Sequence, residues 1–108
     1  MEARVVLITA PDEETARRLA RGLVDEGLAA CVNLIDRVQS IYRWEGAVEE
    51  TVEVLMIAKT TSSALEAAEK WLIANHPYDV PEFVALDPES VEPAYLAWLV
   101  GQVGGQAE

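Results

Sequence analysis

The chain is 108 residues long, and 51% of its residues are hydrophobic while 25% are charged. This balance is typical of one folded domain spanning residues 1–108 and excludes an intrinsically disordered chain. Nineteen Asp and Glu against eight Lys and Arg give a net charge of −11. Nucleic acid and anionic membranes are therefore excluded as partners, because both require a basic surface. We expect residues 103–108 to form a frayed tail.

The cysteine count and the N-terminal residues favour a cytoplasmic location. Cys31 is the single cysteine, so no intrachain disulfide can form and nothing suggests an oxidising compartment. The apolar run at residues 5–8 is too short for a signal-peptide core or a membrane span.

The first third of the chain alternates strand and helix patterns. Residues 4–10 form a short apolar, β-branched run that predicts a buried strand. A helix follows, because Asp12 is a typical N-cap residue and Gly27 a typical residue at which helices close. Residues 28–35 predict a second strand, and the Asp-Arg pair at 36–37 predicts a bulge before the strand resumes.

A long β-hairpin is predicted over residues 40–61, with its turn at Glu45 and Gly46. The second arm, residues 47–60, contains neither Pro nor Gly and would extend about 45 Å at about 3.3 Å per residue. A compact domain of this length has a diameter of only about 35 Å, so the hairpin should project beyond it. Apolar side chains lie near the tip: Ile41, Tyr42 and Trp44. Their exposure to water is unfavourable, so we expect the tip to contact another subunit.

Two further helices and a short strand are predicted after the hairpin. A Ser-Ala-Leu-Glu capping box at 63–66 predicts the start of a helix, and Pro77 predicts its end. Its buried stripe would consist of Leu65, Ala68 and Leu72. Residues 82–86 predict a strand, and residues 90–103 predict a last helix capped by Ser90. The apolar stripe of this helix would consist of Tyr95, Trp98, Leu99 and Val103.

The predicted order is β-α-β-β-α-β followed by a terminal helix. This order is typical of the ferredoxin-like fold of the α+β class, in which one antiparallel sheet carries two helices on one face. The long hairpin would then serve assembly.

The chain offers little for nucleophilic catalysis. A nucleophile needs a base beside it, and the only pair of suitable residues is Cys31 and His76. Cys31 lies in an apolar strand, where a free cysteine is usually a small buried hydrophobe. We therefore predict that the protein is not an enzyme.

The densest polar cluster is the segment His-Pro-Tyr-Asp-Val-Pro-Glu at residues 76–82. Its His, Asp and Glu are metal-ligand types, although His76 would equally well satisfy carbonyl groups at a helix C-terminus. Lys59 is the other unusual residue, because it lies alone in an apolar strand. It would pair with a carboxylate or extend its ammonium group into solvent.

Six motifs together carry a resemblance. They are Thr-Ala-Pro-Asp-Glu at 9–13, Leu-Ala-Ala-Cys-Val-Asn at 28–33, Ser-Ile-Tyr-Arg-Trp-Glu-Gly at 40–46, Lys-Thr-Thr at 59–61, the segment at 76–82, and Tyr-Leu-Ala-Trp-Leu at 95–99. Their order resembles that of the CutA family, the divalent-cation tolerance proteins. The resemblance covers nearly the whole chain, from about residue 5 to residue 99.

This resemblance implies a cytoplasmic homotrimer of ferredoxin-like subunits, similar in build to the PII signalling proteins. It also implies a role in tolerance of copper and other divalent cations, without an established catalytic reaction. Copper binding in the family is associated with a Cys in the first strand and a His-His pair before the Pro-Tyr. The corresponding residues in this chain are Ile8, Asn75 and His76, so only His76 carries over as a metal ligand.

Two functions follow from these observations. The first is a trimer in divalent-metal tolerance, which acts by weak binding of copper or another divalent cation at His76 or as a structural and regulatory protein. The second is a PII-like signalling trimer that binds a small metabolite in clefts between subunits. Saturable binding of a metabolite but not of copper would separate the second from the first. The candidate residues for such a cleft are Cys31, Tyr42, Trp44, Lys59, Tyr78, Glu82 and Trp98.

Overall fold

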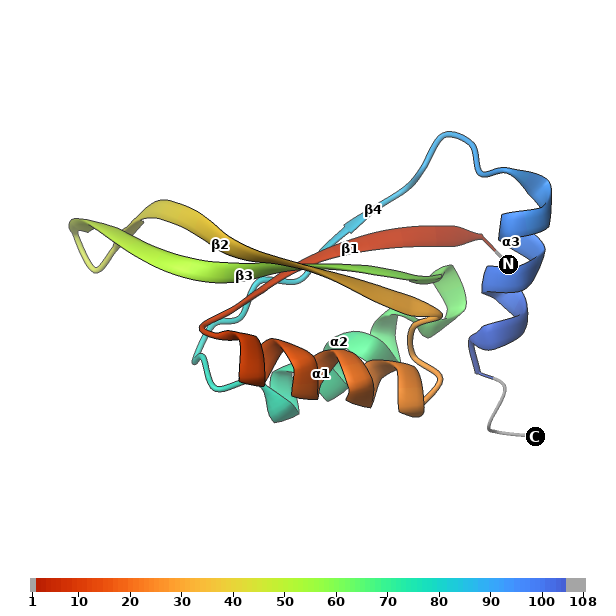
Figure 1. Cartoon of the computed structure of the whole chain (residues 1–108), viewed down its shortest axis with the longest axis horizontal. Helices are drawn as coiled ribbons and strands as arrows, with labels where there is room; N and C mark the ends of the chain where they lie inside the picture. Colours follow the sequence, from red (N-terminus) through yellow and green to blue (C-terminus); the bar gives the residue numbers. More distant parts are fainter. Residues whose placement is uncertain (1, 105–108) are drawn as a thin grey trace.

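The fold is an antiparallel sheet with two helices on one face and a third helix at one end (Figure 1). The computed structural model describes residues 2–104. From the N-terminus the elements are β1 (Ala3–Ala10), α1 (Glu13–Asp25), β2 (Cys31–Trp44), β3 (Ala47–Thr61), the 3₁₀ turn η1 (Ser62–Ala64), α2 (Leu65–Asn75), β4 (Val84–Leu86) and α3 (Pro93–Gln102). The strands pair in the order β2-β3-β1-β4, and every neighbouring pair is antiparallel. The predicted ferredoxin-like α+β fold is confirmed.

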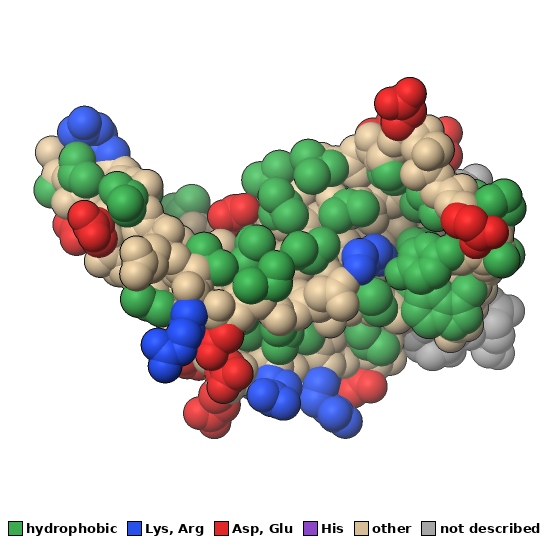
Figure 2. All heavy atoms as spheres, turned by 45° about the horizontal axis from the view of Figure 1, so that its top comes forward, with side chains coloured by type: hydrophobic (Ala, Val, Ile, Leu, Met, Phe, Trp, Pro, Cys, Tyr) green, Lys and Arg blue, Asp and Glu red, His purple; other side chains and the backbone are tan. Residues whose placement is uncertain are grey.

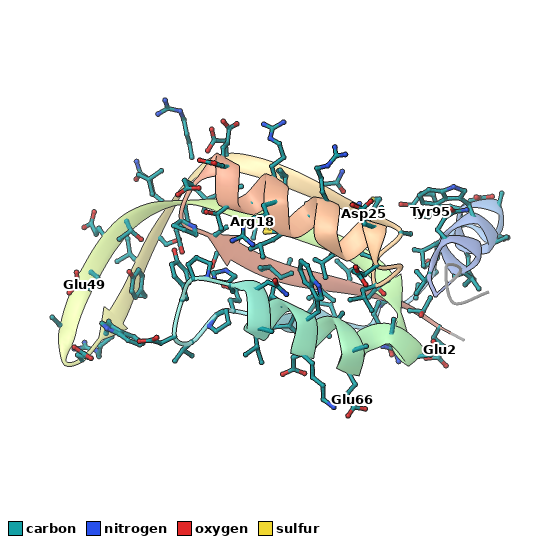
Figure 3. The ribbon with its side chains drawn as sticks, turned by 90° about the horizontal axis from the view of Figure 1, so that it is seen from below. Glu2, Arg18, Asp25, Glu49, Glu66 and Tyr95 are labelled. Atoms are coloured by element: carbon teal, nitrogen blue, oxygen red, sulfur yellow. The ribbon has the colours of Figure 1, made fainter. Side chains whose placement is uncertain are left out.

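The main core lies between the sheet and the layer formed by α1 and α2. Side chains alternate across a strand, so β1 and β3 each present every second residue to the helices. The buried strand residues of this core are Val6, Ile8, Ala10, Val54, Met56 and Ala58. Leu19 and Leu23 of α1 and Leu72 of α2 pack against them, each at most 1% exposed. Figure 3 shows α1 and α2 side by side across the sheet, with α3 beyond their ends.

The first helix begins as predicted, whereas the other two predicted caps are wrong. The Asp12 carboxylate accepts from the Thr15 backbone N–H at 2.8 Å, and this hydrogen bond lowers the pKa of Asp12. Ser63 does not cap α2, because the chain first makes the η1 turn, in which the Ser63 and Thr61 hydroxyls lie 3.1 Å apart. Ser90 does not cap α3.

Helix α3 begins three residues after Ser90, at Pro93. A proline suits the first helical position because its fixed φ is helical and its missing N–H would have no partner there. Glu92 is the N-cap instead, and its carboxylate accepts from the Tyr95 backbone N–H at 2.9 Å.

The predicted bulge is confirmed in β2, which begins later than predicted. The pairing of β2 with β3 shifts between Ile35 and Val38, where Arg37 has a φ of 62°. The strand begins at Cys31 rather than at residue 28. The backbone N–H of Leu28 donates to the Leu23 carbonyl at the end of α1, so residues 28–30 complete the helix-to-strand connection. The last strand, β4, is likewise shorter than predicted.

The hairpin projects from the rest of the chain (Figure 1). Glu45 and Gly46 have φ values of 50° and 84°, as a two-residue turn with both residues at positive φ requires. The longest dimension of the molecule is 44 Å. The side chains of Ile41 and Val48 on the hairpin are 66% and 62% exposed in the single chain.

Helix α3 packs on the end of the sheet through two of the four predicted stripe residues, Leu99 and Val103. Leu99 is buried against Ala3 and Ala30, and Leu96 and Val103 pack beside it. The predicted stripe residues Tyr95 and Trp98 are 40% and 44% exposed, because docking through Leu96 and Leu99 turns them outward.

The first two residues of the predicted tail, Val103 and Gly104, contact the rest of the domain. Val103 packs against the second cluster, and the Gly104 backbone N–H donates to the Gly27 carbonyl at 2.7 Å. The remainder of the predicted tail, residues 105–108, lies outside the described residues. No helix among residues 2–104 is long and apolar enough to cross a membrane.

Candidate functional site

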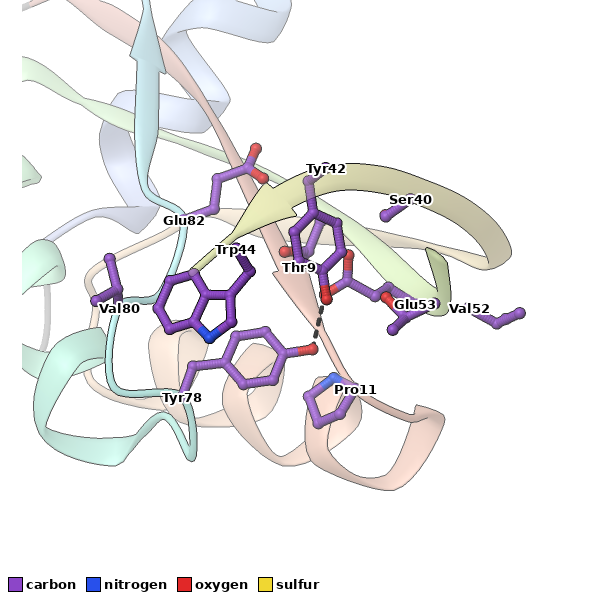
Figure 4. A pocket seen from close by; sticks show the side chains of 11 residues that line it. Thr9, Pro11, Ser40, Tyr42, Trp44, Val52, Glu53, Tyr78, Val80 and Glu82 are labelled. Carbon is purple, nitrogen blue, oxygen red and sulfur yellow. Dashed lines mark hydrogen bonds between the residues drawn. The ribbon is translucent and has the colours of Figure 1, made fainter. Parts of the chain in front are cut away.

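A hollow of about 650 Å³ lies beneath the hairpin, where β2 and β3 leave the body of the domain (Figure 4). Three parts of the chain supply its walls: the hairpin strands, the end of β1, and the loop between α2 and β4. The residues that matter most for its chemistry are Thr9, Tyr42, Trp44, Glu53, Tyr78 and Glu82. The ring of Tyr78 and the carboxylate of Glu53 meet inside it.

Strand periodicity places the hairpin side chains in the hollow. Tyr42 and Trp44 are two residues apart in β2 and therefore point to the same face. Val38 of β2 pairs with Glu53 of β3, so Glu53 shares that face beyond the bulge. The hollow is thus formed on the side of the sheet opposite α1 and α2.

His76 anchors the loop that closes the hollow. Its Nδ1 accepts from the Tyr78 backbone N–H at 3.1 Å, and its Nε2 lies 2.8 Å from the Thr9 carbonyl oxygen. A nitrogen that accepts an N–H carries no proton itself, so the proton is on Nε2, which donates to Thr9. His76 is 8% exposed. The imidazole therefore ties the loop to β1 and positions the Tyr78 ring.

Tyr78 and Glu53 form the strongest polar contact of the hollow. The Tyr78 hydroxyl donates to Glu53 Oε2 at 2.6 Å. Burial raises the pKa of Tyr78, and the hydrogen bond to Glu53 raises it further. The phenol therefore remains a neutral donor at physiological pH. Burial also raises the pKa of Glu82, and the negative charge of Glu53 adds to this effect.

The predicted cleft residues divide into two groups. Four of them line the hollow: Tyr42, Trp44, Tyr78 and Glu82. The other three, Cys31, Lys59 and Trp98, lie toward the opposite end of the sheet. Cys31 and Lys59 face each other across β2 and β3, and Trp98 belongs to α3, where its ring packs against that of Tyr95.

Lys59 pairs with an amide, not with a carboxylate. Its Nζ donates to Asn33 Oδ1 and lies 3.9 Å from Cys31 Sγ. The side chain of Tyr95 lies beside the same cysteine, and burial and the Cys31 sulfur raise the pKa of the Tyr95 hydroxyl. Cys31, Lys59 and Tyr95 therefore form a polar cluster between the sheet and α3, separate from the hollow.

Glu53 and Thr9 are site residues that the sequence analysis missed. Glu53 is one of three glutamates on the long β3 arm, and nothing in its immediate neighbours sets it apart from the other two. The available signal was strand alternation, which places Glu53 on the same face of β3 as Leu55 and Ile57.

The structure does not present His76 as a ready metal ligand. Both ring nitrogens take part in hydrogen bonds to the backbone, so a metal ion would have to displace Thr9 or Tyr78. Ile8 is fully buried in the core, and the Asn75 amide donates to the Trp71 carbonyl. Within residues 2–104 no group of three or more His, Cys, Asp and Glu could hold a metal ion.

Comparison with known proteins identifies the family. A family model described as CutA1 divalent ion tolerance protein matches residues 4–102. The chain belongs to this family. The divalent-cation tolerance protein CutA of Thermus thermophilus is 49% identical over 100 residues, which span 93% of this chain and 97% of that protein. Protein CutA of the mouse is 47% identical over 92 residues. The match covers 85% of this chain but only 52% of the mouse protein, so the chain spans about half the length of that relative.

Solved CutA structures have the same fold. The divalent cation tolerance protein Cut A1 from Thermus thermophilus superposes with a TM-score of 0.92 at 48% identity, covering 94% of this chain and 99% of that one. CutA1 from Oryza sativa gives a TM-score of 0.92 at 42% identity, covering 95% and 94%. A rice CutA relative is named chloroplastic, and a CutA of Archaeoglobus fulgidus is described as periplasmic, so family membership does not decide location.

Proposed function

We propose that this protein is a cytoplasmic homotrimer that acts in tolerance of divalent metal ions, copper among them, as a structural and regulatory protein without a catalytic reaction. The trimeric state and the role in metal tolerance are taken from the family resemblance. The observation that carries the assembly is the apolar face of the sheet opposite α1 and α2. Figure 2 views this side of the molecule, and hydrophobic side chains gather over the middle of it.

Strand alternation identifies the residues of this open face. They alternate with the core residues along β1 and β3 or pair with residues that do: Val5, Leu7, Ile35, Leu55, Ile57, Val84 and Leu86. Ile35, Val84 and Leu86 are 47%, 45% and 45% exposed in the single chain. Contiguous apolar patches of this kind mark protein interaction sites. A second copy of the chain, which offers the same apolar face, is a suitable partner.

The projecting hairpin supports the same assembly. Ile41, Val48 and Val52 lie on one side of the hairpin and are 66%, 62% and 57% exposed. A hairpin that extends away from its own core gains stability only by packing on another element. Light scattering coupled to size exclusion tests the proposal. We expect three times the chain mass of 11.8 kDa; a monomer would contradict assembly, and a dimer would contradict the trimer.

We further propose that metal binding is weak and requires His76 to leave its present partners. Neutral imidazole is the strongest ligand in the loop, but its two hydrogen bonds compete with a metal ion. Calorimetric titration of Cu²⁺ into the wild type and His76→Ala should show weaker binding by the variant. Equal binding would place the metal elsewhere, on the acidic surface.

A second candidate function is binding of a small molecule in the manner of PII-like proteins. The hollow favours it, because its volume of about 650 Å³ lies within the usual range of about 300–1,000 Å³ for ligand sites. A thermal-shift screen of metabolites and divalent metals on metal-free protein separates the two functions. Stabilisation by a metabolite but not by copper would favour the second.

A further inference from the structure

The hollow beneath the hairpin has a chemical character that metal tolerance does not explain. We infer that it binds a small organic cation, an ammonium or guanidinium group carried on an apolar body, rather than a metal ion or an anionic metabolite. This inference rests on the second proposed function and names the chemical class of the small molecule.

Two carboxylates supply the negative charge that an organic cation requires. Glu53 is 8% exposed and accepts one hydrogen bond from Tyr78. Glu82 lines the same hollow (Figure 4). The ion pairs found among residues 2–104 include neither of them. A buried carboxylate without a cation is unfavourable, and the two charges also repel each other. A cation bound between them would offset both costs.

Three aromatic rings surround the same space. The side chains of Tyr42, Trp44 and Tyr78 all point into the hollow (Figure 4). The face of an aromatic ring attracts a cation within about 6 Å and also packs against apolar groups. An alkylammonium ion gains from both effects, whereas a hydrated metal ion gains little from either. Carboxylates combined with aromatic rings therefore select an organic cation.

The same lining disfavours the two competing ligand classes. Among the described residues that line the hollow there is no Lys, Arg or His, so no side chain is present to neutralise a phosphate or carboxylate ligand. Burial and Glu53 keep the Tyr78 phenol protonated, so it cannot serve as a phenolate ligand for a metal. Glu53 and Glu82 alone fall short of the three or more protein donors typical of a metal site.

Three ligands that share a phenyl ring and differ in charge test the inference. Benzylammonium, benzyl alcohol and benzoate have nearly the same size and differ in charge. Calorimetric titration into the metal-free wild-type protein should show saturable binding of benzylammonium, about tenfold tighter than that of benzyl alcohol. Benzoate should not bind. Equal binding of the ammonium and the alcohol, or preferred binding of benzoate, would overturn the inference.

Three variants locate the site. Glu53→Gln keeps an oxygen that accepts from Tyr78 but removes the charge, and should weaken benzylammonium binding about tenfold. Trp44→Leu keeps an apolar side chain but removes the ring, and should weaken it about fivefold. Glu50→Gln is the matched control, because Glu50 is exposed on the opposite face of the same strand. An equal loss in Glu50→Gln would overturn the inference in favour of diffuse attraction to the acidic surface.

The oligomeric mass of the same samples separates this inference from the proposed assembly. A trimer that fails to bind benzylammonium overturns the inference and leaves the proposed trimer intact. A monomer that binds benzylammonium with the expected variant pattern supports the inference and contradicts the trimer.

Discussion

The two faces of the sheet differ in what covers them, although both carry apolar residues over the middle of the sheet. On the helix side, Val54, Met56 and Ala58 of β3 are at most 3% exposed. On the other side of the same strand, Leu55 and Ile57 are only partly buried. An antiparallel sheet that faces water on one side normally carries polar residues there. The apolar open face therefore favours the proposed assembly, in which the sheet would be covered on both sides.

The difference also shows where charge is tolerated. The outer surfaces of α1 and α2 carry exposed charged residues such as Arg18 and Glu66 (Figure 3). On the open face of the sheet body, outside the projecting hairpin, two groups of polar residues stand apart. One is Lys59 with Asn33 and Cys31, and the other is the Glu53 group in the hollow. In the proposed assembly, the covered face would stabilise the subunit and the open face would bind other molecules.

The strongest test of this comparison is to place a charge on the open face. Ile57→Asp would bury an unpaired carboxylate in the proposed trimer, which costs about 3–5 kcal/mol per subunit. We expect the trimer to dissociate while circular dichroism retains the α+β spectrum. Ile73→Asp is the matched control, because Ile73 on α2 is 54% exposed and its substitution should leave the mass unchanged. Dissociation of both variants would contradict a specific role of the open face.

A substitution on the covered face should instead lower the stability of the subunit without dissociating the trimer. Leu72→Ala removes a fully buried side chain from the main core, and a loss of about 2–5 kcal/mol in the free energy of unfolding is expected. Urea denaturation at one fixed protein concentration measures it, since the stability of an oligomer depends on concentration. The mass of the folded protein should not change. A trimer that dissociates without loss of subunit stability would show that the two faces are not independent.

The sequence predicted the fold well where local pattern and turn chemistry act alone. The tight turn at Glu45 and Gly46 depends on the conformation of two adjacent residues, and the bulge at residues 36–37 is equally local. The caps at Ser63 and Ser90 failed because each competed with a second signal nearby. Pro93 determined the start of α3, and the η1 turn used Ser63 before α2 could begin.

The candidate site was predicted only in part because its residues meet through tertiary structure. Tyr78 and Glu82 stand in one recognisable polar segment, but Glu53 reaches Tyr78 from 25 residues away. The outward position of Trp98 likewise depends on which side of α3 docks on Ala3 and Ala30. Helical periodicity alone could not predict which side of α3 docks, because apolar residues lie on most sides of this helix.

A third test sharpens the comparison at the hairpin. Trp44 is 46% exposed in the single chain, and the proposed trimer would bury part of the remaining surface. Trp44→Ala should therefore cost about 2 kcal/mol and shift the trimer toward dissociation. The melting temperature and the mass measured over a dilution series report this loss. A melting temperature and mass identical to those of the wild type would show that the Trp44 ring is not part of an interface.

The smallest expected effect concerns Glu82 in the hollow. Burial and the charge of Glu53 raise its pKa above the ordinary value of 4.5, so the folded protein holds this proton more tightly than the unfolded chain. The stabilising contribution of the protonated form is therefore complete below pH 4.5 and is lost as the pH rises through the raised folded pKa. At pH 7 the ionised group is a net cost, which Glu82→Gln should remove. Because Glu82 is partly exposed, we expect a gain below about 1 kcal/mol.

Denaturation curves of the wild type and Glu82→Gln at pH 7 and pH 4 measure this cost in ligand-free protein. The variant should be more stable at pH 7, and the difference should shrink at pH 4. Glu89→Gln is the control, because Glu89 is exposed outside the hollow. A variant that is less stable at pH 7 would show that a cationic group already pairs with Glu82 in the assembled protein. The hollow would then belong to the subunit interface, and the division between a face for assembly and a site for recognition would not hold.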